Sequence, residues 1–149
     1  VFRKTFITEN QKGAETADAW TLADMMIPLG LPAKLVRVPD PSSQEFRISA
    51  VADRLKFVQP TPVVVLAGAM TARGGKTMAG IARAAHNAGA VILDSGVGSS
   101  IEKFAIRRNV PLIGVCPEAE VTFPKISQNK PANELTSGHS HLFLLGDSS

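Results

Sequence analysis

The chain has 149 residues and a net charge of +3, with 44% hydrophobic and 19% charged residues and a mean hydropathy of +0.09. This composition excludes a disordered, collagen-like or coiled-coil protein, and a single domain of this length buries about 70% of its unfolded surface. Because the apolar runs are too short to cross a bilayer, we expect no membrane insertion and a cytoplasmic location. The small number of aromatic residues and the lack of a basic half disfavour nucleic acid as a partner, whereas a small anionic ligand fits the charge.

Residues 1–60 are expected to form an N-terminal flank that packs on the main domain. The pattern of residues 14–29 predicts a helix that ends at the following glycine and proline. Residues 33–38 read as an extended segment. A proline- and serine-rich turn then leads to a second helix over 49–58, where apolar residues recur at helical spacing.

Residues 61–149 alternate between apolar runs and helical segments. Four continuously apolar runs are typical of strands covered on both faces: 63–67, 90–93, 112–115 and 142–145. Helices are expected between them over 78–88, with Gly89 as the C-terminal cap, and over 99–108. The alternation predicts an α/β fold, a Rossmann-like three-layer sandwich with a mostly parallel sheet.

The loop that follows the first apolar run ends in the tripeptide GKT. The spacing does not match a phosphate-binding P-loop, because the glycine that this motif requires falls on Met70. A flexible glycine-rich connection and a phosphate role for Lys76 or Arg73 both remain open.

The loop that follows the second apolar run has the sequence DSGVGSS, over residues 94–100. Two glycines allow close backbone approach, and two serines add hydroxyl groups beside the amides of a helix start, an arrangement that suits a phosphate or diphosphate. A plain turn is the alternative. Ser99 and Glu102 also fit a helix capping box, which gives Glu102 a structural role.

His139 and His141 precede the last apolar run, and alternate strand positions would point both imidazoles to one face. No third or fourth ligand stands at a recognisable spacing, so neither a metal nor another cofactor is expected. The single cysteine, Cys116, reads as a small buried apolar residue, and one cysteine allows no internal disulfide.

Four segments together resemble a known family. They are GIARAA at 80–85, GAVILDSGV at 89–97, PLIGV at 111–115 and GHSHLFLLGD at 138–147. Their order resembles the SLOG (LSDAT) domain of the N-terminal region of melastatin-type transient receptor potential channels, and is closest to its prokaryotic relatives. The resemblance covers residues 62–149. It implies a Rossmann-like domain that binds or senses a nucleotide-derived ligand, ADP-ribose or a related NAD product.

In this family the ligand lies over the glycine loops. The matching ligand-binding positions of this chain are Gly68, Ala69, Ser95, Gly96, Val97, Gly98, Ser99, Ser100 and His139. The family continues beyond the His-Ser-His segment to a further helix and strand, so we expect a sheet that is incomplete at the C-terminus. Exposed edge strands of such a sheet favour a homo-oligomer.

Two other functions remain open beside a non-catalytic ligand sensor. Residues 95–102 imitate the GGxGTxxE loop of lonely-guy-type phosphoribohydrolases, which implies a nucleotide N-glycosidase with Glu102 as catalytic residue and Arg73 or Arg83 on the ribose or phosphate. The third function is a protein-interaction module that needs no ligand. The sensor is favoured, and under it no catalytic residue is expected.

Overall fold

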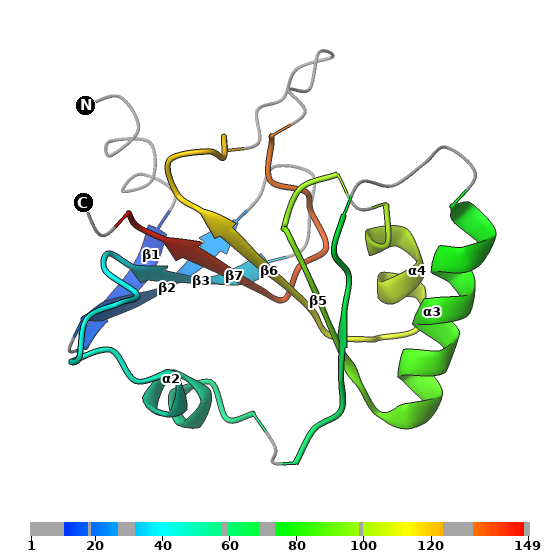
Figure 1. Cartoon of the computed structure of the whole chain (residues 1–149), viewed down its shortest axis with the longest axis horizontal. Coiled ribbons are helices and arrows are strands. Elements are labelled where there is room, and N and C mark those ends of the chain that lie inside the picture. Colours follow the sequence, from blue (N-terminus) through cyan, green and yellow to red (C-terminus); the bar gives the residue numbers. More distant parts are fainter. Residues whose placement is uncertain are drawn as a thin grey trace.

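The computed structural model describes residues 11–17, 19–26, 32–57, 60–68, 74–98, 100–123 and 133–147. They form one seven-stranded sheet in the order β1-β2-β3-β7-β6-β5-β4 (Figure 1). The strands are β1 (Gln11–Ala17), β2 (Trp20–Met26), β3 (Pro32–Val38), β4 (Val63–Val65), β5 (Val91–Asp94), β6 (Leu112–Pro117) and β7 (His141–Leu145). The described helices are α2 (Ile48–Arg54), α3 (Gly75–Ala88) and α4 (Glu102–Arg107).

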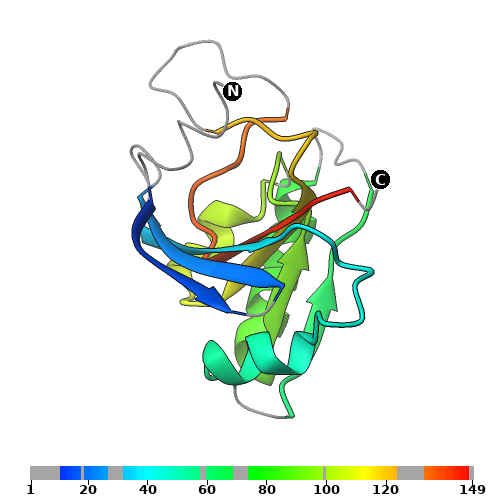
Figure 2. The ribbon, with the colours of Figure 1, turned by 90° about the vertical axis from the view of Figure 1, so that its left-hand side faces the viewer.

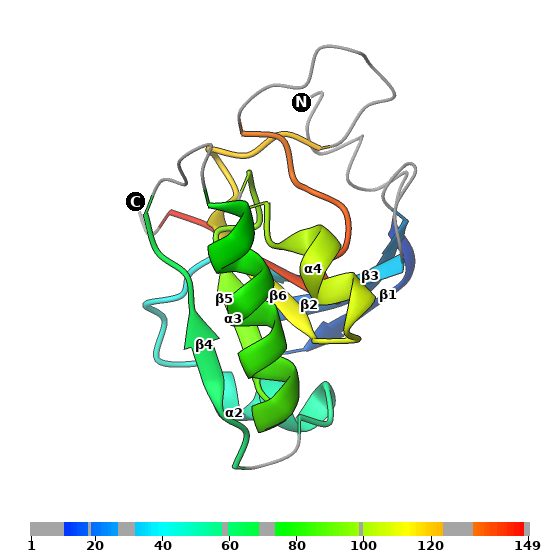
Figure 3. The same ribbon diagram turned by 90° about the vertical axis from the view of Figure 1, so that its right-hand side faces the viewer.

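Five strands of the sheet are parallel: β4 pairs with β5, β5 with β6, β6 with β7, and β7 with β3. Helix α2 covers one face, whereas α3 and α4 cover the other, as the views in Figures 1 and 3 show. The four apolar runs form the expected strands, and β5, β6 and β7 are mostly buried, so alternation with polar residues is not needed there. The expected cover on both faces is wrong for β4, which lies at the edge of the sheet with Val63 and Val65 56% and 63% exposed. The predicted α/β three-layer fold with a mostly parallel sheet is confirmed.

The helix predicted over 14–29 is wrong. Residues 14–17 belong to β1 and residues 20–26 form β2, and these antiparallel strands lie side by side at the edge of the sheet (Figure 2), whereas residues 18 and 27–29 lie outside the described residues. Ala19, at φ +61°, makes the tight turn between them, and β2 then pairs with β3 along six residues. Pairing between strands therefore overrides the helical propensity of the alanine, leucine and methionine residues. The flank thus adds three strands to the sheet.

The two faces of the sheet have separate cores. Val51 of α2 packs with Trp20, Val36, Val38, Ile113 and Phe143 on one face. On the other face, α3 and α4 bury Met78, Ala82 and Ile101 against Ile92 and Leu112. Beside these helices, Val121, Phe123 and Leu135 form a further buried cluster with Leu142 and Leu144 of β7. None of the described helices is long and apolar enough to cross a membrane.

The ends of the helices differ from the predicted ends in ways that have local causes. Helix α3 ends as expected at Gly89, which adopts φ +61°, but it begins earlier than predicted, at Gly75. Helix α2 is shorter than predicted because Lys56 adopts φ +57° just after its end. Helix α4 begins at Glu102 rather than Ser99, since Ser100 adopts φ +60° and cannot lie in a right-handed helix.

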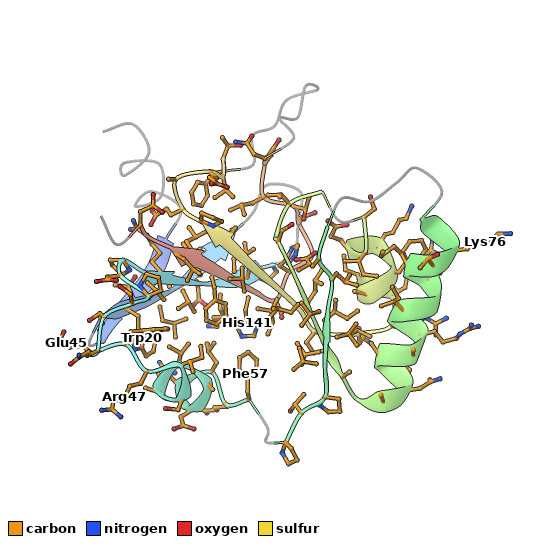
Figure 4. The ribbon with its side chains drawn as sticks, in the orientation of Figure 1. Trp20, Glu45, Arg47, Phe57, Lys76 and His141 are labelled. Atoms are coloured by element: carbon orange, nitrogen blue, oxygen red, sulfur yellow. The ribbon has the colours of Figure 1, made fainter. Side chains whose placement is uncertain are left out.

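His141 opens strand β7 on the face that α2 covers. Its ring packs edge-on against Phe57, with the ring centroids 5.0 Å apart (Figure 4). Ser140 Oγ lies 2.9 Å from its Nδ1 atom. Burial lowers the pKa of His141 from its ordinary value of 6.5, and the nearby positive charge of Lys34 lowers this pKa further.

This lowered pKa predicts a loss of stability in mild acid. Below pH 6.5 the unfolded chain protonates His141 while the folded chain resists the proton, so the free energy of unfolding falls as the pH falls. The substitution His141→Gln removes this contribution. Urea unfolding between pH 7.5 and pH 5 is expected to show a shallower decline for the variant than for the wild type, and equal declines would contradict the assignment.

Candidate functional site

Two glycine-containing loops leave the sheet at the same edge. Strands β4 and β5 are parallel neighbours with Val65 opposite Leu93, so the loops that follow them emerge together, toward the top of Figure 1. In the first loop Gly68 adopts φ +98°, and a side chain there would meet only open space. Ala69 and Arg73 lie outside the described residues. Ligands of open parallel sheets bind at this carboxyl edge of the strands.

The loop after β5 is held at its base by buried polar contacts. Asp94 is 4% exposed, and its Oδ1 atom accepts a hydrogen bond from the Gly96 amide at 2.9 Å. The same oxygen lies 2.7 Å from His139 Nε2. The Gly96 carbonyl in turn accepts from the Thr136 amide at 2.9 Å and from the Thr136 hydroxyl at 3.2 Å. Both polar groups of the Gly96 backbone are therefore fixed.

A glycine on the neighbouring strand lets this loop lie on the sheet. A Cβ atom at Gly114 would lie 2.8 Å from Gly96 Cα, 2.7 Å from Leu142 Cδ2 and 3.1 Å from His139 Cδ2. Gly96 itself adopts φ +74° and is buried. Sequence reasoning missed Gly114, although a glycine inside an apolar strand often marks a close approach of another backbone segment.

The outer half of the same loop faces solvent. Gly98 adopts φ +57° with nothing near the position of a Cβ atom, and Ser100 adopts φ +60°. Ser95 and Ser100 are exposed, and the Ser95 hydroxyl donates to the Val97 carbonyl at 3.1 Å. Ser99 lies outside the described residues. Left-handed residues at 96, 98 and 100 turn the backbone repeatedly, which allows its amides to approach a ligand closely.

Helix α3 begins at this edge of the sheet. The helix has 14 residues, no side chain caps its N-terminus, and its first turn has no acidic residue. Lys76 projects outward from this turn (Figure 4). An uncapped helix start carries a partial positive charge and donor groups, both of which favour an anion.

The structure places the two predicted histidines on opposite faces. His139 is 1% exposed and lies beside Asp94, whereas His141 packs against Phe57 beneath α2. The same-face expectation is wrong because β7 begins only at His141, and Gly138, at φ +103°, turns the chain before it. Direct ligand contact by His139 stays a prediction. Within the described ranges, no group of three His, Cys, Asp or Glu side chains could hold a metal ion.

The capping role predicted for Glu102 is wrong. A helix starting at Ser99 would need Ser100 in a right-handed conformation, and Ile101, which precedes the observed helix, makes no side-chain cap. Instead Glu102 opens α4 with its Oε1 atom shielded from solvent and without a hydrogen-bond partner among the described residues. The Oε1 atom therefore does not hold the helix start.

Cys116 lies behind the loop and is a small buried residue, as expected. The pKa of its thiol is raised to about 12, mainly by burial and to a lesser degree by the negative charges of Asp94 and Glu118. Because the thiolate is the nucleophilic form, the geometry gives Cys116 a packing role.

The contacts of Gly114 predict a large effect of one added methyl group. Gly114→Ala forces the loop or Leu142 to move and is expected to lower the free energy of unfolding by about 1–3 kcal/mol. Gly80→Ala is the matched control, because its Cβ atom enters open space within α3 and should stabilise the helix by up to about 1 kcal/mol. Urea unfolding measures both changes, and equal effects of the two variants would refute the packing argument.

The part of the chain that matches a known family begins at residue 61, where the alternation of apolar runs and helical segments also begins. No curated protein matches the chain. Residues 61–149, which include β4 to β7 and both glycine loops, match the family described as SLOG in TRPM, prokaryote. This match covers more than half of the chain. The chain therefore belongs to the prokaryotic family of TRPM-type SLOG domains.

Proposed function

We propose that the protein binds a nucleotide-derived diphosphate, with ADP-ribose or a related NAD product as the leading ligand. The observation that carries the proposal is the left-handed loop of Gly96 and Gly98, which lies at the carboxyl edge of the sheet beside the Gly68 loop. Membership of the SLOG family supports a nucleotide-related ligand.

The described groups at this edge favour negative charge. The uncapped start of α3 carries no carboxylate, Lys76 lies in its first turn, and Ser95 and Ser100 supply exposed hydroxyls. The nearest carboxylate in the loop, Asp94, is buried and already accepts the Gly96 amide. A diphosphate would therefore meet donors at the surface of the loop, whereas an uncharged nucleoside would gain little from them.

Binding can be tested by thermal shift and calorimetry with ADP-ribose, NAD, AMP and adenosine. A ligand that binds only the folded state adds about 2.7 kcal/mol of stability at 100 times its Kd. We expect ADP-ribose to stabilise the protein and adenosine not to do so.

Gly98→Ala should weaken ADP-ribose binding by about tenfold or more, because the added methyl group stands where the backbone must approach the ligand. Gly89→Ala is the matched control. Gly89 has nearly the same φ, +61°, and an equally open Cβ position, but it ends α3 at the far edge of the sheet. Equal loss of affinity in both variants, or no loss in either, would contradict binding at the loop.

A nucleotide N-glycosidase is the second candidate, and the buried Oε1 atom of Glu102 favours it. A carboxylate oxygen without a hydrogen-bond partner among the described residues can serve a substrate as acid or base. If the protein releases free base from a nucleotide, Glu102→Gln should abolish turnover and leave nucleotide affinity within about twofold. Product analysis by chromatography separates the candidates, and unchanged turnover in the variant would remove Glu102 from the chemistry.

A further inference from the structure

The glycine loop is held by a segment that lies about forty residues further along the chain. Val97 forms an antiparallel bridge with Leu135, and Thr136 donates to the Gly96 carbonyl through both its amide and its hydroxyl. His139 completes the contact at Asp94. The loop is thus clamped between the carboxylate of its own strand and the segment of residues 133–140.

The hydrogen bonds of His139 define how many protons its ring must carry. Nδ1 lies 3.1 Å from the Thr136 carbonyl, and Nε2 lies 2.7 Å from Asp94 Oδ1. A carbonyl oxygen only accepts, and Asp94 Oδ1 already accepts from the Gly96 amide. With Asp94 ionised, both ring nitrogens must therefore donate, and only the imidazolium form carries both N–H groups.

The surroundings of the pair keep this arrangement isolated from water. The side chains of His139 and Asp94 are 0% and 1% exposed. Other described titratable groups nearby are Cys116 from β6, a neutral thiol, Glu102 from α4, whose Cβ atom lies beside Gly138, and the buried Glu134 on the segment of residues 133–140. A buried cation and a buried carboxylate in direct contact compensate one another, whereas either charge alone would be costly.

We propose that Asp94 and doubly protonated His139 form a latch that holds the glycine loop of residues 94–98 in its ligand-binding shape, and that loss of one proton from His139 to solvent releases the loop. This proposal deepens the proposed function and rests on it, because it makes ligand affinity depend on pH. Affinity for an anionic ligand is high while the latch is protonated and declines toward alkaline pH.

Release follows from the same contacts. A neutral imidazole carries one N–H, so either the Thr136 carbonyl or the Asp94 carboxylate then faces a nitrogen lone pair in a buried site. The loop can relieve this contact by opening locally, which costs less than unfolding the sheet. The apparent affinity then falls in proportion to the fraction of molecules whose latch is closed.

The latch can be tested on the full chain without any ligand. Nitrogen-15 NMR of the imidazole rings reports protonation of each nitrogen, and His86→Gln and His141→Gln assign the three histidine signals. We expect both nitrogens of His139 to be protonated where the loop is ordered. As the pH rises, the amide signals of Gly96 and Gly98 should change along the His139 titration curve, whereas that of Gly89 should not. A singly protonated His139 beside an ordered loop, or a His139 that keeps both protons until the protein unfolds, would overturn the proposal.

Variants then connect the latch to binding. Asp94→Asn and His139→Gln are each expected to weaken ADP-ribose binding by about tenfold. The double variant should weaken binding by no more than about tenfold, because each single substitution already removes the same contact between Asp94 and His139. His141→Gln, two residues from His139 on the opposite face, should stay within twofold of the wild type. Additive losses in the double variant would refute the latch, and because the NMR experiment uses the wild type, a variant that fails to fold leaves that test intact.

The outcomes for the latch and for the ligand are separable. If Gly96 and Gly98 follow His139 but ADP-ribose does not bind, the latch stands and the proposed ligand is wrong. If ADP-ribose binds with the same affinity on both sides of the His139 titration, the proposed function stands and the latch is wrong.

Discussion

The close contact between Gly96 and Gly114 is the constraint on which the candidate site depends. Because neither residue has a side chain, the loop after β5 lies directly on β6, and a Cβ atom at Gly114 would meet the Gly96 backbone at 2.8 Å. This approach brings the loop within reach of Thr136 and places the His139 ring over the same strand. The polar contacts of Asp94 are then buried under the loop, and the short-range packing of two glycines determines the shape of the whole edge.

The resulting loop has two halves with different physical tasks. Its inner half, Asp94 and Gly96, is buried and hydrogen-bonded, whereas its outer half is exposed, and nothing lies near the position of a Cβ atom at Gly98. A rigid base with an open rim is the arrangement that a backbone-mediated anion site requires, since the donors must be positioned before the ligand arrives. The neighbouring start of α3 adds a partial positive charge at the same edge.

Sequence reasoning succeeded where the signal was local and failed where it depended on distant partners. The elements from residue 61 onward were predictable because β5, β6 and β7 are buried and apolar along most of their length, and because Gly89 ends α3 as a left-handed cap. The segment 14–29 was misassigned because its strands exist only through pairing with each other and with β3. The Asp94–His139 contact joins residues 45 positions apart, and the left-handed Ser100 that prevents the capping box has no signature in composition. Gly114 was the one missed residue that a pattern could have revealed.

Binding of a diphosphate nucleotide at the carboxyl edge of β4 and β5 is the central claim, and mapping of backbone amide shifts during titration with ADP-ribose tests it most directly. The account predicts saturable changes at Gly68, Gly75, Gly96 and Gly98, with little change at α2 on the opposite face. Saturable changes confined to another surface, or no saturable change at millimolar ligand, would contradict it.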